Sequence, residues 1–179
     1  MHKELDALQA NHNWEITDLS IAKNHVSSKW VYRVKRKADG SIKRYKARLV
    51  ARGFSQMEGL NYHETFAPVV KMNTVRSLLA VAVSKNWPLF QLDVDNAFLH
   101  GDLHEEVYVT PPPRFFKTEK AQGKVFRLLK SLYGLKQAPR QWFSKFSDSL
   151  LSFGFTQSLN DFPSSLTIRM VISWLYDGP

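Results

Sequence analysis

The feature that most constrains the fold is a pair of alternating segments on either side of Asp39-Gly40. From Lys29 to Lys37 apolar and aromatic residues alternate with cations, and a second segment of similar character runs from Lys43 to Val50. An alternation of period two is typical of β-strands, and glycine accepts the positive φ that a tight hairpin turn needs. The sequence therefore predicts a half-buried β-hairpin with a cationic outer face.

The positive charge of the chain is concentrated in the same hairpin. Residues 29–52 contain ten lysines and arginines and one acid, Asp39, and the formal net charge of the whole chain is +9. Trp30, Tyr32 and Tyr45 are interleaved with these cations. A local basic patch with aromatic residues is typical of a partner with a phosphate backbone, whereas a short basic run is more often a solvated face. We favour a nucleic-acid partner and keep the solvated face as the alternative.

Apolar periodicity predicts an irregular series of helices and short strands after the hairpin. The predicted helices cover residues 1–13, 75–85 and 139–153, and the predicted strands cover residues 88–93, 105–110 and 125–129. The helix at 75–85 is apolar on nearly every side, so we expect it to be buried, with Asn73 or Thr74 as its cap. Helices and strands in irregular order behind a hairpin indicate the α+β class.

Cysteine content and the length of apolar runs exclude several classes of protein. The chain has no cysteine, so neither a disulfide framework nor a thiolate zinc site is available. Its longest apolar run, Leu78 to Val83, is too short for a membrane span, and the N-terminus has no signal-peptide pattern. We expect an intracellular protein, cytoplasmic or nuclear and not secreted, with no membrane partner. Its 179 residues can form one domain or part of a larger one.

Asp93 is the strongest catalytic candidate in the chain. It ends the predicted strand 88–93 and is followed by a predicted turn at 96–101. A carboxylate at a strand end, with backbone carbonyls exposed by the next turn, can hold a divalent cation. Aspartate is common at strand ends, so this signal alone favours a structural role.

Four longer motifs favour a catalytic role for Asp93 over a structural one. They are Asp93-Val94-x-x-Ala97-Phe98 and the segments 46–54, 64–71 and 131–140. In order and spacing they resemble the copia-type (Pseudoviridae) retrotransposon reverse transcriptase, over about residues 5–151. The resemblance implies a right-hand polymerase fold over residues 1–179. Residues 1–87 are then mainly fingers, and residues 88–179 are part of the palm, with an incomplete antiparallel sheet.

The resemblance also implies roles for residues near the nucleotide. Asp93 is expected to bind a catalytic metal together with the carbonyl of Val94. Phe98 is expected to be the steric gate that excludes a ribose 2′-OH, although an ordinary core aromatic would satisfy the same position. Tyr133 and Gly134 are expected to line the nucleotide pocket, where glycine lets the backbone approach the template base.

Six further cations receive roles from the resemblance. Four of them, on the hairpin, are expected to clamp the triphosphate, in a register that the sequence leaves open: Lys35, Lys37, Lys46 and Arg48. Lys136 and Arg140 are expected to lie near the template strand. The partners implied are an RNA template, a DNA primer and a dNTP, with integrase and RNase H as other segments of the polyprotein.

Polymerisation in this family is an in-line displacement at two Mg²⁺ ions, which needs at least two carboxylates. The family supplies the second and third from a Tyr-x-Asp-Asp hairpin, whereas this chain has Tyr176-Asp177-Gly178-Pro179 at that point. We expect a C-terminally truncated domain, inactive by itself, with Mg²⁺ not productively bound and with residues 166–176 beside the Asp93 strand. The alternatives are a non-enzymatic nucleic-acid-binding module that uses the basic hairpin, and a fragment that folds poorly.

Overall fold

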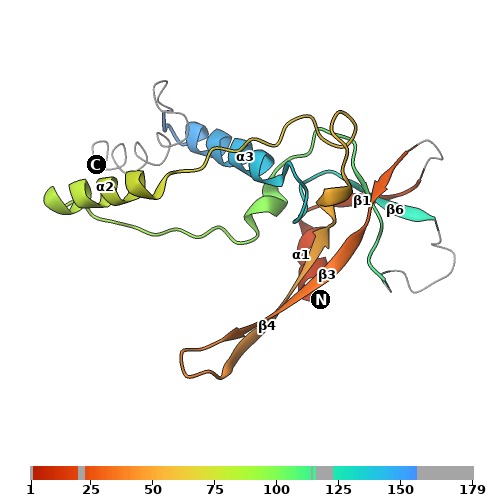
Figure 1. The fold of residues 1–179 in the computed structure, drawn as a ribbon, viewed down its shortest axis with the longest axis horizontal. Coiled ribbons are helices and arrows are strands. Elements are labelled where there is room, and N and C mark those ends of the chain that lie inside the picture. Colours follow the sequence, from red (N-terminus) through yellow and green to blue (C-terminus); the bar gives the residue numbers. More distant parts are fainter. Residues whose placement is uncertain (1, 20–22, 114, 116–122, 157–179) are drawn as a thin grey trace. The chain divides into compact units, whose positions relative to one another are not determined.

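The structure is a computed structural model that describes residues 2–19, 23–113, 115 and 123–156 (Figure 1). The chain divides into two compact units, Met1–Thr65 with Asn96–Trp142, and Phe66–Asp95 with Phe143–Pro179. No helix within the described residues is long and apolar enough to cross a membrane.

Two sheets lie in the first unit. A four-stranded sheet has the order β1 (Trp14–Asp18), β6 (Lys124–Leu128), β5 (Tyr108–Val109) and β2 (His25–Val26). In it β2 and β5 are parallel, and the other neighbours are antiparallel. The second sheet is a two-stranded antiparallel ribbon of β3 (Ser28–Arg36) and β4 (Ile42–Ala51). With three α-helices among the described elements, the mixture of helices and sheets expected from the sequence is confirmed. Of the strand predicted at 105–110, two residues pair as β5.

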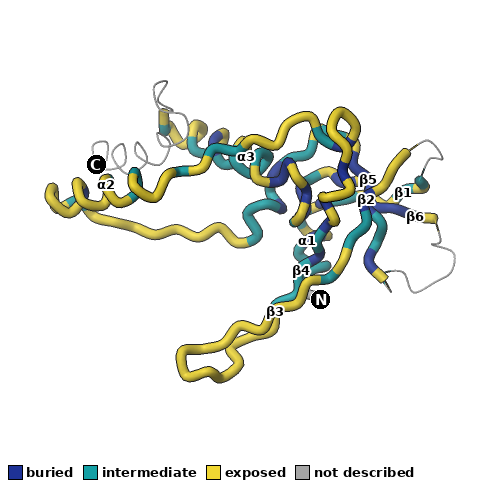
Figure 2. The backbone as a smooth tube through the Cα atoms, in the orientation of Figure 1, coloured by how far each residue is buried: buried dark blue, intermediate teal, exposed yellow. Residues whose placement is uncertain are grey.

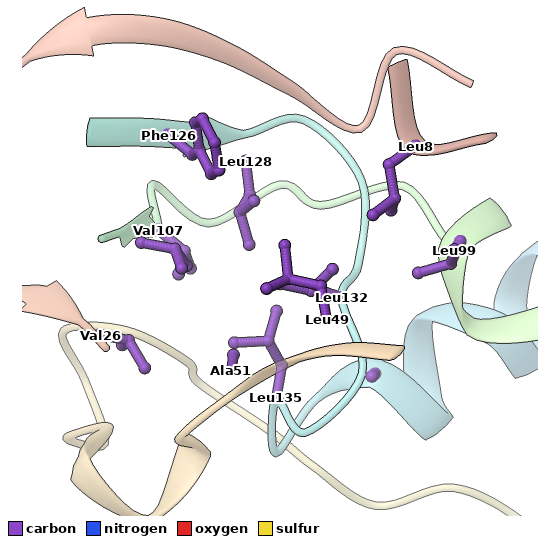
Figure 3. Close-up of a cluster of buried hydrophobic side chains, with 12 residues drawn as sticks. Leu8, Val26, Leu49, Ala51, Leu99, Val107, Phe126, Leu128, Leu132 and Leu135 are labelled. Atoms are coloured by element: carbon purple, nitrogen blue, oxygen red, sulfur yellow. The ribbon is translucent and has the colours of Figure 1, made fainter. Parts of the chain in front are cut away.

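The core of the first unit joins α1 (His2–Ala10) to the inner end of β4 and to the four-stranded sheet. Figure 3 shows its largest side chains, which are less than 2% exposed: Phe126, Leu8, Leu49, Leu99 and Leu132. Trp14 stacks on Phe126 with ring centroids 4.3 Å apart. The ribbon is thus anchored in the core at one end only.

The predicted hairpin is confirmed, but its predicted half-burial is wrong over most of its length. Tyr32 and Tyr45 are 64% and 76% exposed, and the ribbon is exposed from its middle to its turn (Figure 2). The reason is that two strands have no second layer to cover them beyond the inner end. The turn has Gly40 at φ 82°, and the Asp39 carboxylate accepts hydrogen bonds from the hydroxyl and the backbone N–H of Ser41. These hydrogen bonds lower the pKa of Asp39.

In the second unit, the predicted helix is present as α2 (Met72–Ser84), but the expectation that it is buried is wrong. Ala82 is its one buried residue, whereas Val83 is 68% exposed. Lys71, and not Asn73 or Thr74, is the N-cap, and it makes no capping hydrogen bond through its side chain. An apolar helix is buried only when another element covers it.

The strand predicted at 88–93 is also wrong, because residues 87–94 have no regular secondary structure. Phe90 and Leu92 are 74% and 86% exposed. A strand needs a neighbour for its backbone hydrogen bonds, and none of the strands described pairs with this segment. Residues 166–176, which we expected beside it, lie outside the described residues. The helix predicted at 139–153 is confirmed as α3 (Ala138–Ser152), and Gly154 follows it at φ 89°.

Asn13, which follows α1, is completely buried and ties three segments together. Its Nδ2 donates to the carbonyls of Leu99 (3.0 Å) and Ser131 (3.2 Å). Its own carbonyl accepts from the backbone N–H groups of Leu129 (2.9 Å) and Lys130 (3.2 Å). The sequence did not predict this network. It fixes the short 3₁₀ helix η2 (Ala97–His100), which carries Phe98.

We predict that Asn13→Ala destabilises the chain by about 2 kcal/mol, because the Ser131 carbonyl loses its donor and the Leu99 carbonyl keeps only the one from Asn11. The shift of the urea unfolding midpoint, at constant slope, measures this loss. Asn24→Ala is the matched control, since Asn24 is exposed and its loss should stay within about 0.5 kcal/mol. Equal midpoint shifts in the two variants would contradict the role given to Asn13.

Candidate nucleotide and nucleic-acid interface

The strand register of the ribbon separates cations from aromatic residues. Arg33 lies opposite Lys46, Lys35 lies opposite Arg44, and Val31 lies opposite Arg48. Directly opposed residues share a face of a sheet, and alternate residues along a strand do so too. One face, which we call the cationic face, therefore carries these residues: Arg33, Lys35, Arg44, Lys46 and Arg48. The other face carries Trp30, Tyr32, Val34 and Tyr45.

Three of the four predicted triphosphate-clamping residues, Lys35, Lys46 and Arg48, thus share the cationic face. Lys37 lies beyond the end of β3, and its backbone N–H bonds the Ser41 carbonyl in the turn (2.8 Å). None of the salt bridges found among the described residues involves a cation of β3 or β4. The cationic face is therefore open to an external anion.

Glu4 on α1 is the acid that acts on this face from within the chain. Burial raises the pKa of Glu4, while a hydrogen bond from the Leu49 backbone and the charges of Arg48 and Lys46 lower it. One carboxylate oxygen of Glu4 is buried without a hydrogen-bond partner. Glu4 lies at the inner end, and no salt bridge within the described residues joins an acid to the outer part of the face.

Arg48, Tyr133 and Phe98 form a cluster at the inner end of the ribbon. The guanidinium of Arg48 lies over the Tyr133 ring at 4.6 Å, within the range of a cation–π contact. The Phe98 ring meets Tyr133 edge to face, with centroids 5.9 Å apart. The Tyr133 hydroxyl donates to Asn96 Oδ1 at 3.3 Å. Arg48 and Phe98, which were predicted separately for nucleotide binding, thus both contact Tyr133, the third such residue.

Phe98 also packs against the buried core, as the alternative interpretation of this residue expected. Tyr133 is fixed through its backbone, because its carbonyl accepts from the Ala51 N–H at 2.7 Å. The cluster is therefore held in place by packing against the core and by a backbone hydrogen bond.

Gly134 is needed for packing within the chain. Its φ is 88°, and an added Cβ would lie 2.2 Å from the Ala51 carbonyl oxygen. A Cβ on Gly53 would in turn lie 2.0 Å from the Gly134 carbonyl oxygen. Two glycines thus let the end of β4 approach the 133–137 loop. The approach of Gly134 to a template base stays a prediction.

Lys136 and Arg140, predicted near the template, both have partners inside the chain. Lys136 Nζ donates to the Gln56 carbonyl at 3.2 Å and lies 4.9 Å from the centre of the Tyr62 ring. Arg140 pairs with Glu64 at 2.8 Å. Both contacts hold the 53–64 segment against the start of α3.

A buried amide network in the same place was missed by the sequence reasoning. Gln137 is fully buried, accepts from Gln56 Nε2 at 3.0 Å and donates to the Asn61 carbonyl at 2.9 Å. The Lys136 backbone N–H completes it by donating to Gln56 Oε1 at 2.9 Å. Gln137 directly precedes α3 and has charged and polar residues nearby, so no local pattern marked it as buried.

Asp93 and Val94 belong to the second unit and lie in its exposed segment without regular structure. A carboxylate and a carbonyl are oxygen ligands of the kind that Mg²⁺ prefers. Among the described residues, however, no three His, Cys, Asp or Glu side chains gather as a metal site. The donors in the described ranges are of the right type but too few for two ions.

Comparison with known proteins agrees with the motifs. A family model described as reverse transcriptase (RNA-dependent DNA polymerase) matches residues 11–169. The retrovirus-related Pol polyprotein from transposon RE1 of Arabidopsis thaliana is 44% identical over 164 residues, which are 90% of this chain and 11% of that protein. The corresponding polyprotein from transposon TNT 1-94 of Nicotiana tabacum is 44% identical over 161 residues, 90% of this chain and 12% of that protein.

A more distant relative is the transposon Ty1-ER2 Gag-Pol polyprotein of Saccharomyces cerevisiae. It is 33% identical over 159 residues, 84% of this chain and 8% of that protein. No solved structure matches the chain. The chain therefore spans a small part of the length of these polyproteins.

Gly134→Ala and Gly40→Ala form a matched pair, since both glycines have φ above 80° but Gly40 has nothing within 4 Å of an added Cβ. We predict that Gly40→Ala lowers the free energy of unfolding by about 1 kcal/mol, which is the conformational cost alone. Gly134→Ala should lose at least about 2 kcal/mol more, because overpacking against Ala51 is added. Urea unfolding of both variants measures the difference, and losses of the same size would contradict the tight contact.

Proposed function

The chain belongs to the reverse transcriptase (RNA-dependent DNA polymerase) family, and we propose that it supplies the nucleotide- and template-binding part of an RNA-directed DNA polymerase. The observation that carries the proposal is the Arg48–Tyr133–Phe98 cluster at the inner end of the cationic face. An aromatic pair beside a guanidinium can pack against a sugar and attract a phosphate at once. This is the chemistry that an incoming nucleotide requires.

Within this proposal the chain has the right-hand arrangement of a polymerase, with residues 1–87 mainly as fingers and 88–179 as part of the palm. Arg48 binds the triphosphate together with the other three predicted hairpin cations, and Phe98 excludes the ribose 2′-OH. Lys136 and Arg140 direct the 53–64 segment toward the template, through their contacts with Gln56 and Glu64.

Asp93 and the Val94 carbonyl are the proposed ligands of one of two Mg²⁺ ions, which together would stabilise the attacking and leaving oxygens. The 179 residues contain no adjacent pair of aspartates. We therefore propose polymerisation for a longer polypeptide that includes this segment, and not for these residues by themselves. RNA template, DNA primer and dNTP are its proposed substrates.

The similar proteins are Pol polyproteins, and integrase and RNase H segments are the further partners that we propose, in an intracellular setting. A second candidate function is nucleic-acid binding without catalysis. The observation that favours it is the ribbon itself, because Arg33, Lys35 and Arg44 are exposed and form no salt bridge within the described part of the chain.

Both functions require that the hairpin cations bind phosphate groups, and the salt dependence of nucleic-acid binding tests this requirement. We expect replacement of Lys35, Lys37, Lys46 and Arg48 by Gln to weaken binding to a primer–template and to reduce the log–log salt slope by about 3, since each phosphate contact adds about 0.7 to 0.9. Fluorescence anisotropy at several salt concentrations measures the slope. The matched control replaces Lys23, Lys85, Lys124 and Arg127 by Gln, an equal change in charge away from the ribbon. An unchanged slope in the hairpin variant would show that its cations are only a solvated face.

Phe98→Ala separates the two functions. If Phe98 is the steric gate, the wild-type chain with primer–template and Mg²⁺ should bind dUTP better than UTP, which differs from it only by the 2′-OH, and the variant should lose most of that preference. Equilibrium dialysis of the two nucleotides gives the ratio. Phe54→Ala is the control, because Phe54 is 80% exposed and lies in η1 (Gly53–Ser55). A wild-type chain that does not distinguish the nucleotides would favour the non-catalytic module.

A further inference from the structure

Glu4 has a half-buried carboxyl group at the inner end of the cationic face, and the proposed function gives it no role. It lies in the first turn of α1, whose Leu8 shares the core with Leu49 of β4. The backbone N–H of Leu49 donates to the Glu4 carboxylate, yet the carboxylate oxygen Oε1 is buried without a hydrogen-bond partner. An ionised oxygen that is buried and unpaired costs free energy, so these surroundings favour the protonated form of Glu4.

Two cations of the ribbon act in the opposite direction. Burial raises the pKa of Glu4, whereas the Leu49 hydrogen bond and the charges of Arg48 and Lys46 lower it, and the N-terminal ammonium adds a smaller effect of the same sign. None of the salt bridges in the described part of the chain joins Glu4 to Arg48 or Lys46. The attraction therefore acts across a gap, and both cations can still bind an external anion. Arg48 Nε is also buried without a hydrogen-bond partner, so that edge of the guanidinium faces the protein.

The ionisation of Glu4 thus depends on the same two cations that the proposed function assigns to the triphosphate. A triphosphate bound by Arg48 and Lys46 brings negative charge close to Glu4 and offsets the field of the cations, whereas the burial of Glu4 remains. The pKa of Glu4 must then rise above its value in the nucleotide-free chain. Linkage requires the reverse effect as well, so protonation of Glu4 strengthens triphosphate binding by the same factor.

We propose that Glu4 is a further residue of the triphosphate site, which acts through Arg48 and Lys46 and takes up a proton from solvent when the triphosphate binds. The proposal rests on the proposed function of these two cations. Glu4 touches no reacting atom, so it is not a catalytic residue. Its ionised form weakens triphosphate binding by repulsion, and its protonated form removes this repulsion. A residue of α1, outside the ribbon, therefore helps to set the affinity of the site.

A purely structural role would also explain Glu4, because its carboxylate satisfies a backbone donor of β4. Glu4→Gln distinguishes the two roles, since the glutamine carbonyl can still accept from the Leu49 N–H but carries no charge. A structural role predicts that the pH dependence of nucleotide binding is the same in this variant as in wild type. The matched control is Asp6→Asn, which removes the same charge from an exposed position on the same helix.

The test measures dUTP binding to the full chain by isothermal titration calorimetry, over a pH range that begins at the ordinary glutamate pKa of about 4.3. Buffers with different ionisation enthalpies report the number of protons taken up. We expect wild type to take up more protons on binding than Glu4→Gln does, and this comparison cancels the titration of the nucleotide itself.

At neutral pH, Glu4→Gln should bind dUTP about fivefold more tightly than wild type, the size expected for one charge several ångströms away near a protein surface. This difference in affinity should vanish as the pH falls below the Glu4 pKa, because wild-type Glu4 is then uncharged too. Asp6→Asn should behave as wild type. Equal proton uptake in wild type and Glu4→Gln, or an affinity ratio that does not change with pH, would overturn the proposal.

Arg48→Gln gives a second measurement that needs neither nucleotide nor a substitution at Glu4. NMR of the Glu4 side-chain carboxyl should show a higher pKa in this variant, because a charge that favours ionisation is lost. An unchanged pKa would also overturn the proposal. Failure of the proposed function is seen separately, as dUTP affinity that is the same in wild type and Arg48→Gln.

Discussion

The close contact between the end of β4 and the 133–137 loop is the constraint on which the candidate site depends. Because Gly53 and Gly134 have no side chains, the two backbones can approach each other closely. The Ala51 N–H donates to the Tyr133 carbonyl across this contact at 2.7 Å. This contact sets Tyr133 beneath Arg48 and beside Phe98. A ribbon anchored elsewhere would carry the same charges without an aromatic surface at its base.

Buried polar groups, in addition to apolar packing, hold together the segments that form the candidate site. Asn13 joins the end of α1 to η2 and to the 129–131 segment, and Gln137 joins the start of α3 to residues 56–61. A buried amide left without partners is expensive, so each network admits one arrangement of its segments. Apolar side chains such as Leu49 and Leu132 supply most of the burial, while the amides decide the alignment.

Predictions of secondary structure from local sequence patterns were confirmed for the hairpin and α3. Predictions that depended on burial or pairing by distant segments were wrong. The hairpin and α3 were predicted because alternation, Asp39-Gly40 and the helical apolar stripe are local signals. The buried α2 and the strand at 88–93 were wrong, because the apolar pattern says that a segment can be covered but not what covers it. The sequence provided the residue types of the candidate site, and the resemblance provided their roles. The sequence did not provide the strand register that places Lys35, Lys46 and Arg48 on one face, nor did it provide the internal partners of Lys136 and Arg140.

The sequence by itself determined that the chain has a basic hairpin, mixed helices and strands, and the motifs of the reverse transcriptase family, because these depend on residue order within short segments. The tertiary structure alone decided that Arg48 and Phe98 both contact Tyr133, although 85 and 35 positions separate them from it along the chain. It also decided that Gly134 is required by its neighbours within the chain. Such contacts depend on how segments that are distant in sequence pack against one another. Close packing of side chains, and not the periodicity of the sequence, determines this arrangement.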